Sequence, residues 1–260
     1  MRDNQPVTGR EVELADGETI VSHTDTKGRI VSINRTFVRI SGFTEAELIG
    51  QPHNIVRHPD MPPAAFEDFW RTLKAGRPWV GMVKNRCKNG DHYWVNAYVQ
   101  PILENGSVKE YQSVRTKPER AMVARAERFY ARLMAGQLPL ALRLPALTST
   151  QRLTSGLLAA LALPLSTLAL GVTPTLPVTG LLAAGSLVAG LWPILATGRR
   201  IHQGAALARG FADNRTMQYL YTGSADDLGS ILFALKMREA ELRAAVGRIA
   251  DSGLQVSGAA

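Results

Sequence analysis

Short apolar stretches alternate with polar turns over residues 19–117, and their spacing predicts a mixed α and β domain. Alternation with a period of two marks strands, whereas apolar residues three and four apart mark helices. Asn–Gly pairs at 89–90 and 105–106 favour tight hairpin turns between the last three strands. The predicted strands are 19–24, 29–33, 79–88, 92–103 and 108–116.

Helices are predicted between the second and the third strand. Asn34 can cap one helix, and Thr44 with Glu47 three residues later forms a capping box for the next. The prolines at 62–63 open a longer helix that ends near Gly76. The predicted order is therefore a two-stranded hairpin, several short helices and a three-stranded antiparallel meander.

An uncharged apolar run over residues 153–198 sets the middle of the chain apart. One helix of these 46 residues would be about 69 Å long, too long for a hydrocarbon core of about 30 Å. A glycine and two prolines within 171–177 interrupt the run and favour a turn. The segments 153–170 and 178–196 therefore predict a transmembrane helical hairpin. A hairpin buried in a soluble core is the alternative, and 260 residues offer too little chain to surround it.

The charges that flank the apolar run predict its orientation. Residues 121–152 carry five arginines against one glutamate, Arg199 and Arg200 follow the run, and the central turn is uncharged. Basic flanks stay on the cytoplasmic side of a membrane. We therefore expect both termini in the cytoplasm; the family resemblance described below implies that the membrane is a bacterial inner membrane. Because this topology accounts for the net charge of +8, nucleic-acid binding is not predicted.

Cysteine usage and motifs exclude several kinds of site. Cys87 is the only cysteine, which excludes an intramolecular disulfide and a cysteine-based zinc cluster. The polar N-terminus lacks the apolar core of a signal peptide. A glycine-rich G-x-G-x-x-G fingerprint is absent, so dinucleotide binding of the Rossmann type is not predicted, and no metal site is predicted either.

The region after the apolar run, 199–260, resembles a HAMP signal-relay module. Residues 199–207 are predicted as its first helix, 217–221 as an extended connector, and the sequence DDLG at 226–229 as the start of its second helix. An ordinary amphipathic helix is the alternative. The second helix carries a heptad seam that would suit a parallel bundle and hence a homodimer or higher oligomer, at Leu228, Ile231, Leu235, Arg238, Leu242, Ala245 and Ile249.

The order of strands and helices in residues 19–118 resembles a PAS domain. Within it, residues 54–62 (NIVRHPDMP) and 78–94 (PWVGMVKNRCKNGDHYW) are similar to the FAD-binding PAS domain of bacterial aerotaxis receptors. The predicted membrane hairpin also resembles that family. The resemblance implies an FAD cofactor, and it implies a chemotaxis kinase and adaptor as partners through a C-terminal region that this sequence does not contain.

The residue types in these motifs suit a flavin dinucleotide. Trp79 offers an indole face for stacking on the isoalloxazine ring, and Asn amides can read its carbonyl and imide edge. Arg57 suits pyrophosphate oxygens. The candidate FAD-binding residues are Asn34, His53, Arg57, His58, Asp60, Trp79, Asn85, Tyr93 and Tyr111.

Several of these residues also have a purely structural explanation. Arg57 can pair with Asp60 and fix a loop, Asn34 can serve only as a helix cap, and Trp79 can be a core residue. Flavin photoreceptors of the LOV type use a cysteine at the place that His53 occupies here. Because Cys87 lies on a predicted strand instead, covalent photochemistry is not expected.

The sequence therefore predicts an α+β PAS domain, a transmembrane hairpin and an α-helical HAMP-like module. We expect a non-enzymatic redox or oxygen sensor for aerotaxis that relays the flavin redox state through a direct PAS–HAMP contact. A PAS adaptor that binds haem or a small metabolite, and a membrane-anchored flavin oxidoreductase, are the alternatives. The predicted boundaries are 1–18 for an N-terminal cap, 19–118 for the PAS domain, 119–152 for a basic linker helix, 153–198 for the hairpin, 199–252 for the relay and 253–260 for a flexible tail.

Overall fold

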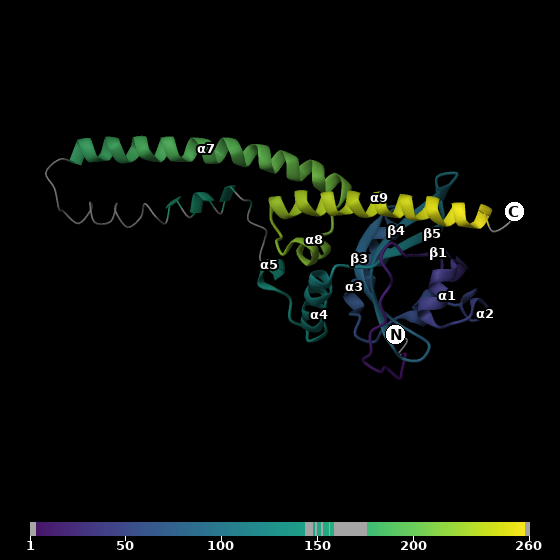
Figure 1. The fold of residues 1–260 in the computed structure, drawn as a ribbon. Coiled ribbons are helices and arrows are strands. Elements are labelled where there is room, and N and C mark those ends of the chain that lie inside the picture. The colour runs from purple at the N-terminus through teal and green to yellow at the C-terminus, as the bar shows by residue number, and fades with distance from the viewer. Residues whose placement is uncertain are drawn as a thin grey trace. The chain divides into compact units, whose positions relative to one another are not determined.

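The structure, a computed structural model, describes residues 4–143, 148, 150–151, 153–155, 157–158 and 176–257. The chain divides into two compact units (Figure 1). The sheet unit comprises Met1–Leu138 together with Met237–Ala260, and the helical unit comprises Pro139–Lys236. The C-terminal part of the chain thus belongs to the same unit as the sheet.

The sheet unit is built on five antiparallel strands in the order β2-β1-β5-β4-β3. The register places Val21 of β1 opposite Val114 of β5, and Val114 opposite Tyr98 of β4. This arrangement confirms the predicted five-stranded sheet. The strands are β1 (Thr19–Asp25), β2 (Ile30–Ile33), β3 (Trp79–Arg86), β4 (His92–Glu104) and β5 (Ser107–Thr116).

Local sequence signals explain where the strands turn and where the helices begin. Asn105 has a φ of 52° and Gly106 a φ of 78°, the left-handed conformation that a tight hairpin between β4 and β5 requires. The Asn34 side chain accepts a hydrogen bond from the backbone N–H of Phe37 and caps α1, and Thr44 forms the predicted capping box of α2. The helices between β2 and β3 are α1 (Arg35–Ser41), α2 (Glu45–Leu48), the 3₁₀ helix η1 (His53–Val56) and α3 (Pro63–Lys74).

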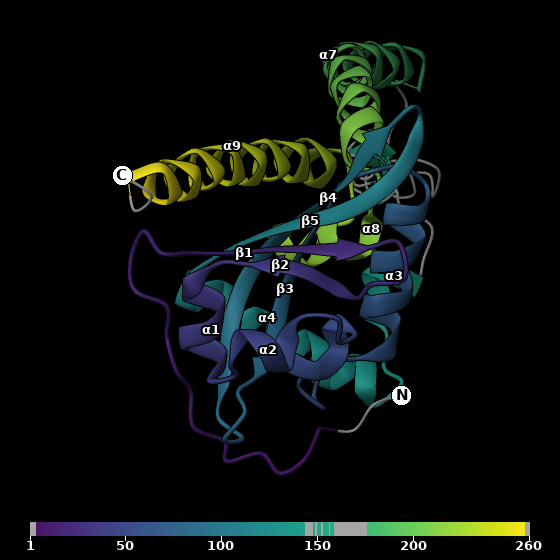
Figure 2. The same cartoon turned by 90° about the vertical axis from the view of Figure 1, so that its right-hand side faces the viewer.

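The outer face of the sheet is covered by two helices from later in the chain. Helix α4 (Arg120–Met134) lies on β3, where the Tyr130 hydroxyl donates to the Met82 carbonyl oxygen at 2.7 Å. Helix α9 (Asp227–Ser257) buries Ala244 against Val21, Tyr98 and Val114 (Figures 1 and 2). The outer face is therefore an interface for helix docking rather than an exposed surface at these positions.

Helix α9 comes close to the sheet because it presents small side chains there. Ala240 packs beside Ala244 in the same cluster. A Cβ placed on Gly247 would lie 3.0 Å from Cγ2 of Thr19, so even a methyl group would be tight. Larger apolar residues of α9, including Leu242, are exposed instead.

The helical unit contains α5 (Leu140–Arg143), α7 (Leu176–Phe211), α8 (Arg215–Thr222) and the first residues of α9. The prediction of an extended connector at 217–221 is wrong, because these residues lie in α8. Asn214 caps this helix by accepting from the backbone N–H of Met217 at 2.9 Å, and Gly223 ends it in a left-handed conformation. Asp227 at the start of α9 forms an ion pair with Arg209 of α7 at 3.2 Å.

The predicted hairpin is only partly covered by the described residues. Most of its first segment, 153–170, lies outside them, and its second segment, 178–196, lies within α7 together with the predicted relay helix 199–207. Within the described ranges, no helix has both the length and the hydropathy needed to cross a bilayer. The predicted linker helix 119–152 is helical at Arg120–Met134 and Leu140–Arg143.

Candidate functional site

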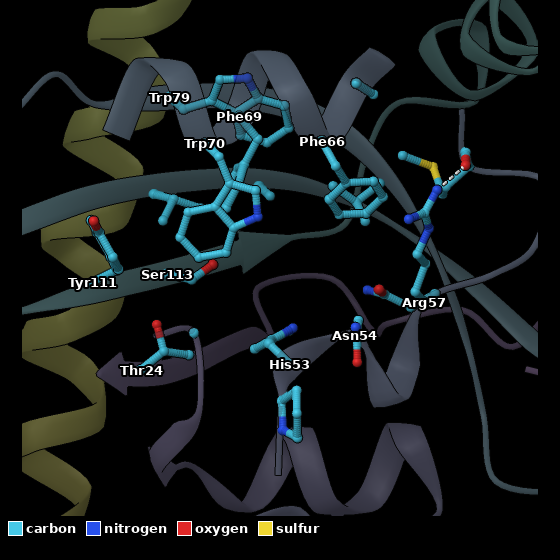
Figure 3. Close-up of a pocket in the computed structure, with 18 of the residues that line it drawn as sticks. Thr24, His53, Asn54, Arg57, Phe66, Phe69, Trp70, Trp79, Tyr111 and Ser113 are labelled. Carbon is cyan, nitrogen blue, oxygen red and sulfur yellow. Dashed lines mark hydrogen bonds between the residues drawn. The ribbon is translucent and has the colours of Figure 1, made fainter. Parts of the chain in front are cut away.

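The inner face of the sheet and helix α3 enclose a cavity of about 320 Å³ (Figure 3). This volume lies in the range of small-molecule sites, which is about 300–1,000 Å³. The strands contribute alternate residues, since side chains two apart on a strand share a face. The lining residues are Thr24, Lys27, Gly28, Pro52, His53, Asn54, Arg57, Met61, Ala65, Phe66, Phe69, Trp70, Trp79, Val83, Asn85, Ala97, Val99, Tyr111, Ser113 and Arg115.

Aromatic rings form one side of the pocket. The Phe69 ring meets the Trp79 ring edge to face at a centroid distance of 5.1 Å, and it meets Trp70 in the same way at 4.9 Å. Tyr111 of β5 lies against Trp70 at 5.6 Å. Figure 3 shows these rings gathered on one side of the pocket and Arg57 on the other. A planar aromatic ligand would find stacking partners on this side.

Arg115 is a buried cation in the pocket wall. Its guanidinium donates to the Ser22 hydroxyl at 3.1 Å and lies 2.7 Å from Nε2 of His53. Among the described residues no carboxylate forms an ion pair with it, and burial lowers the pKa of Arg115 to about 10. A buried charge without a counter-ion is costly. An anionic or strongly polar ligand group would offset that cost.

His53 completes this polar end of the pocket. Burial and the neighbouring Arg115 charge hold the pKa of His53 well below its usual value, so the imidazole is neutral at neutral pH. A neutral imidazole that accepts from Arg115 at Nε2 carries its proton on Nδ1. Its ring stacks at 5.7 Å on Phe37 of α1. His53 therefore orients the guanidinium and does not supply a proton from Nε2.

Arg57, which directly follows η1, brings a second cation to the pocket. Its guanidinium donates to the Met61 carbonyl oxygen at 2.6 Å and lies 4.2 Å from the centre of the Phe66 ring. The alternative Arg57–Asp60 ion pair does not form, because Asp60 pairs with Lys84 at 2.6 Å. Burial lowers the pKa of Arg57, and no carboxylate among the described residues neutralises it. Arg57 thus remains available to an anion.

Two further polar groups face the pocket from the sheet. The Ser113 hydroxyl of β5 is buried and has no hydrogen-bond partner in the described part of the chain. Asn85 of β3 is also buried in the pocket wall. Buried polar groups in folded proteins are nearly always hydrogen-bonded, so an unpartnered hydroxyl beside a cavity indicates a ligand or water contact.

Of the nine predicted FAD-binding residues, five line the pocket: His53, Arg57, Trp79, Asn85 and Tyr111. Asn34 does not line it, since its amide accepts from Val21 N–H at 3.1 Å and donates to the Thr19 carbonyl at 2.9 Å. Tyr93 is fully buried on the inner face outside the lining.

His58 and Asp60 form a polar group outside the pocket lining. His58 is buried 5.6 Å from the His92 ring, and its Nδ1 accepts from the Asp60 backbone N–H at 3.2 Å. Burial, helped by the Lys84 charge, lowers the pKa of His58 to about 4. His58 and Asp60 therefore stabilise the loop that carries Arg57. Their contacts with a cofactor remain predictions.

Sequence reasoning missed other lining residues for which simple signals existed. Ser113 and Arg115 follow Tyr111 at a spacing of two on the same strand face, so the choice of Tyr111 implied them. Phe66, Phe69 and Trp70 follow a spacing of three and four on α3, and this spacing was the signal that they share one face of the helix. The exposed Lys27 in the β1–β2 turn gave no signal.

Neither Cys87 nor the acidic residues indicate a thiol or metal site in the described part of the chain. The Cys87 thiol is buried, donates to the Ile40 carbonyl oxygen at 3.2 Å, and burial raises its pKa to about 11. No group of three or more metal-ligating side chains occurs in the described ranges. Cys87 is thus a packing residue without thiolate character.

The fold and the pocket define the class of this domain. Residues 30–115 match the family model described as PAS fold, and with the flanking strands and helices they form a PAS domain. The chain is a homologue of the aerotaxis receptor of Escherichia coli (strain K12). The two are 50% identical over 137 residues, which are 53% of this chain and 27% of that receptor.

Two more distant similarities cover smaller parts of the chain. The nitrogen fixation regulatory protein of Klebsiella pneumoniae is 28% identical over 92 residues, 35% of this chain and 19% of that protein. Among solved structures, the dark structure of the blue-light photoreceptor Aureochrome1 LOV aligns with a TM-score of 0.38 and 17% identity. That alignment covers 45% of this chain and 84% of the photoreceptor domain.

Proposed function

We propose that this chain binds FAD in its PAS domain and serves as a redox or oxygen sensor for aerotaxis. The observation that carries the proposal is the composition of the pocket. Aromatic rings line one side, Arg57 and Arg115 contribute two cations without carboxylate partners, and no Asp or Glu of the described chain lines the cavity. The 50% identity to the aerotaxis receptor supports the same assignment.

The pocket residues fit a flavin dinucleotide group by group. Trp79 and Trp70 provide flat apolar surfaces for the isoalloxazine ring. Arg115, Ser113 and Asn85 provide the donors that the carbonyl and nitrogen edge of the ring requires. Arg57 suits a pyrophosphate because a guanidinium fork matches phosphate oxygens. When bound, FAD supplies reversible electron uptake, and the residues of this chain bind and orient it.

The pocket supports sensing better than turnover. The His53 imidazole is neutral and engaged with Arg115, and the lining within the described chain contains no carboxylate that could act as a general acid or base. We therefore propose a non-enzymatic role. A PAS adaptor for haem or a metabolite, and a membrane-anchored flavin oxidoreductase, remain as the alternatives that experiment must separate.

We propose further that the flavin state reaches α9 through the sheet. Ser113 lines the pocket on the inner face of β5, while its neighbour Val114 packs against Ala244 of α9 on the outer face. A redox-dependent movement of β5 would thus change the docking of α9, which is the second helix of the proposed HAMP-like relay. The helix carries an exposed heptad seam at Leu228, Leu235, Leu242 and Ile249 that suits a homodimer or higher oligomer.

The remaining parts of the proposal follow the sequence. We propose a membrane hairpin over 153–198, location in a bacterial inner membrane with both termini in the cytoplasm, and signalling to a chemotaxis kinase and adaptor. The identity to the aerotaxis receptor supports a signalling role. The uncharged run with its basic flanks supports the hairpin.

Identification of the chromophore tests the cofactor assignment. We expect the purified full chain to be yellow and to release FAD on denaturation, close to one per chain, in liquid chromatography. Release of haem, or an intact folded chain that takes up no added FAD, would contradict the assignment and favour the adaptor. Oxidation of a nicotinamide by the holoprotein with steady turnover would favour the oxidoreductase.

A further inference from the structure

The indole of Trp79 lies directly over the backbone of its own strand at Gly81. A Cβ placed on Gly81 would be 2.0 Å from Cη2 of Trp79 and 2.3 Å from its Cζ2. Real Cβ atoms essentially never come so close, so any side chain at position 81 would displace the ring. Glycine is required at position 81 because the indole ring approaches the backbone too closely to leave space for a side chain.

A hydrogen bond to α3 holds the N–H group of the same indole. Nε1 of Trp79 donates to Oδ2 of Asp68 at 3.0 Å, and Asp68 is only 5% exposed. The second oxygen of Asp68 contacts the guanidinium of Arg71, whose side chain is largely exposed. Phe69 packs edge to face on the indole at an interplanar angle of 82° (Figure 3). The plane of Trp79 at the pocket wall is therefore fixed from three sides.

The carboxylate also has an electronic effect on the ring. An indole N–H that donates to an ionised acceptor forms a charge-assisted hydrogen bond, which shifts electron density toward the indole ring. An oxidised isoalloxazine is electron-poor, whereas the reduced ring is electron-rich. An electron-rich indole stacked on the flavin therefore stabilises the oxidised form more than the reduced form, and this lowers the reduction potential.

We propose that Asp68 and Gly81 are positioning residues that orient Trp79 and, through it, set the reduction potential of the bound flavin; this inference rests on the proposed function. Gly81 determines where the indole plane lies. Asp68 determines how much electron density that plane presents. Neither residue lines the pocket, so each acts on the flavin through Trp79.

Anaerobic redox titration of the full-length holoprotein tests the role of Asp68. Asp68→Asn keeps a carbonyl oxygen that can accept from the indole but removes the charge, so we expect a higher midpoint potential. Glu67→Gln is the matched control, because Glu67 is an exposed carboxylate at the preceding position of the same helix. It should leave the potential unchanged.

A double-variant cycle separates an effect through the indole from a direct electrostatic effect. Trp79→Phe retains a ring but has no N–H to donate. If Asp68 acts through Trp79, Asp68→Asn shifts the potential much less in the Trp79→Phe background than in the wild-type background. Equal shifts in both backgrounds would overturn the proposal, since the charge would then act through space.

Flavin fluorescence tests the role of Gly81. A stacked indole quenches the flavin, so we expect Gly81→Ala to raise the fluorescence of bound flavin several-fold and Asp68→Asn to change it less. Unchanged fluorescence in a folded, flavin-loaded Gly81→Ala chain would show that Gly81 does not position the indole of Trp79. If Gly81→Ala does not fold, the nearly isosteric Asp68→Asn cycle decides alone. A wild-type chain that binds no flavin would instead contradict the proposed function.

Discussion

Replacing Arg115 with Met should make the apoprotein more stable and at the same time weaken FAD binding. The guanidinium is buried without a carboxylate partner in the described part of the chain, and burial lowers its pKa to about 10. The folded state therefore disfavours the charged form, and the penalty is fully present below pH 10 and declines as the pH rises through 10 toward the ordinary pKa of arginine. Replacement of buried charges by apolar side chains of similar volume can gain about 1–4 kcal/mol. Loss of the Ser22 and His53 contacts offsets part of this gain, so we expect the lower end.

The same substitution removes the cation that would face the flavin. Hydrogen bonds to charged groups contribute about 1.5–3 kcal/mol, so FAD affinity should fall roughly 10- to 100-fold. Urea unfolding of the solubilised apoprotein and FAD titration measure the two effects. Arg35→Met is the control, because Arg35 is exposed on α1, and it should change neither quantity. Destabilisation together with unchanged affinity would show that Arg115 is a structural residue.

Replacing Ala244 with Gln should detach α9 from the sheet. Ala244 is 1% exposed and packs on Val21, Tyr98 and Val114, so a longer side chain would have to displace these neighbours. Overpacking of such a site costs about 1–3 kcal/mol, which is enough to shift a docking equilibrium by roughly 5- to 150-fold. We expect amide hydrogen exchange across 237–257 to accelerate, measured on the full-length holoprotein by mass spectrometry.

An adjacent position supplies the matched control for this variant. Arg243→Gln introduces the same side chain one residue earlier, at an exposed position whose ion pair with Glu239 spans one helical turn. Exposed pairs of this kind contribute about 0.3–0.5 kcal/mol, so exchange in α9 should hardly change. Equal exchange rates in the two variants would mean that the buried contact at Ala244 does not hold the helix.

The sheet unit was predictable because local signals and long-range packing agree there. The Asn–Gly turns at 89–90 and 105–106 fix which strands are adjacent, and the Thr44 capping box fixes where α2 begins. The helix α8 was missed because Met217 and Leu220 suit a strand as well as a helix. Their state is decided by the cap at Asn214 and the left-handed Gly223, which mark the two ends.

The candidate site was predictable only where one residue type implies one chemistry. Trp79 and Arg57 stand out in the sequence and do line the pocket. Arg115 carries the same charge as many surface arginines, and only the strand register reveals that it points inward beside Ser113 and is buried. For Asn34 the simpler prediction of a helix cap was correct. Both its amide oxygen and its amide nitrogen form hydrogen bonds with the backbone.

If the flavin state is relayed through β5, the redox state of the flavin changes the contact between the sheet and α9. Amide hydrogen exchange across 237–257 tests it most directly when the oxidised holoprotein is compared with the same sample reduced anaerobically by dithionite, with the visible spectrum confirming reduction. We expect different exchange rates in the two states, and we expect Ala244→Gln to abolish the difference while Arg243→Gln preserves it. Identical exchange in fully oxidised and fully reduced wild-type protein would contradict it.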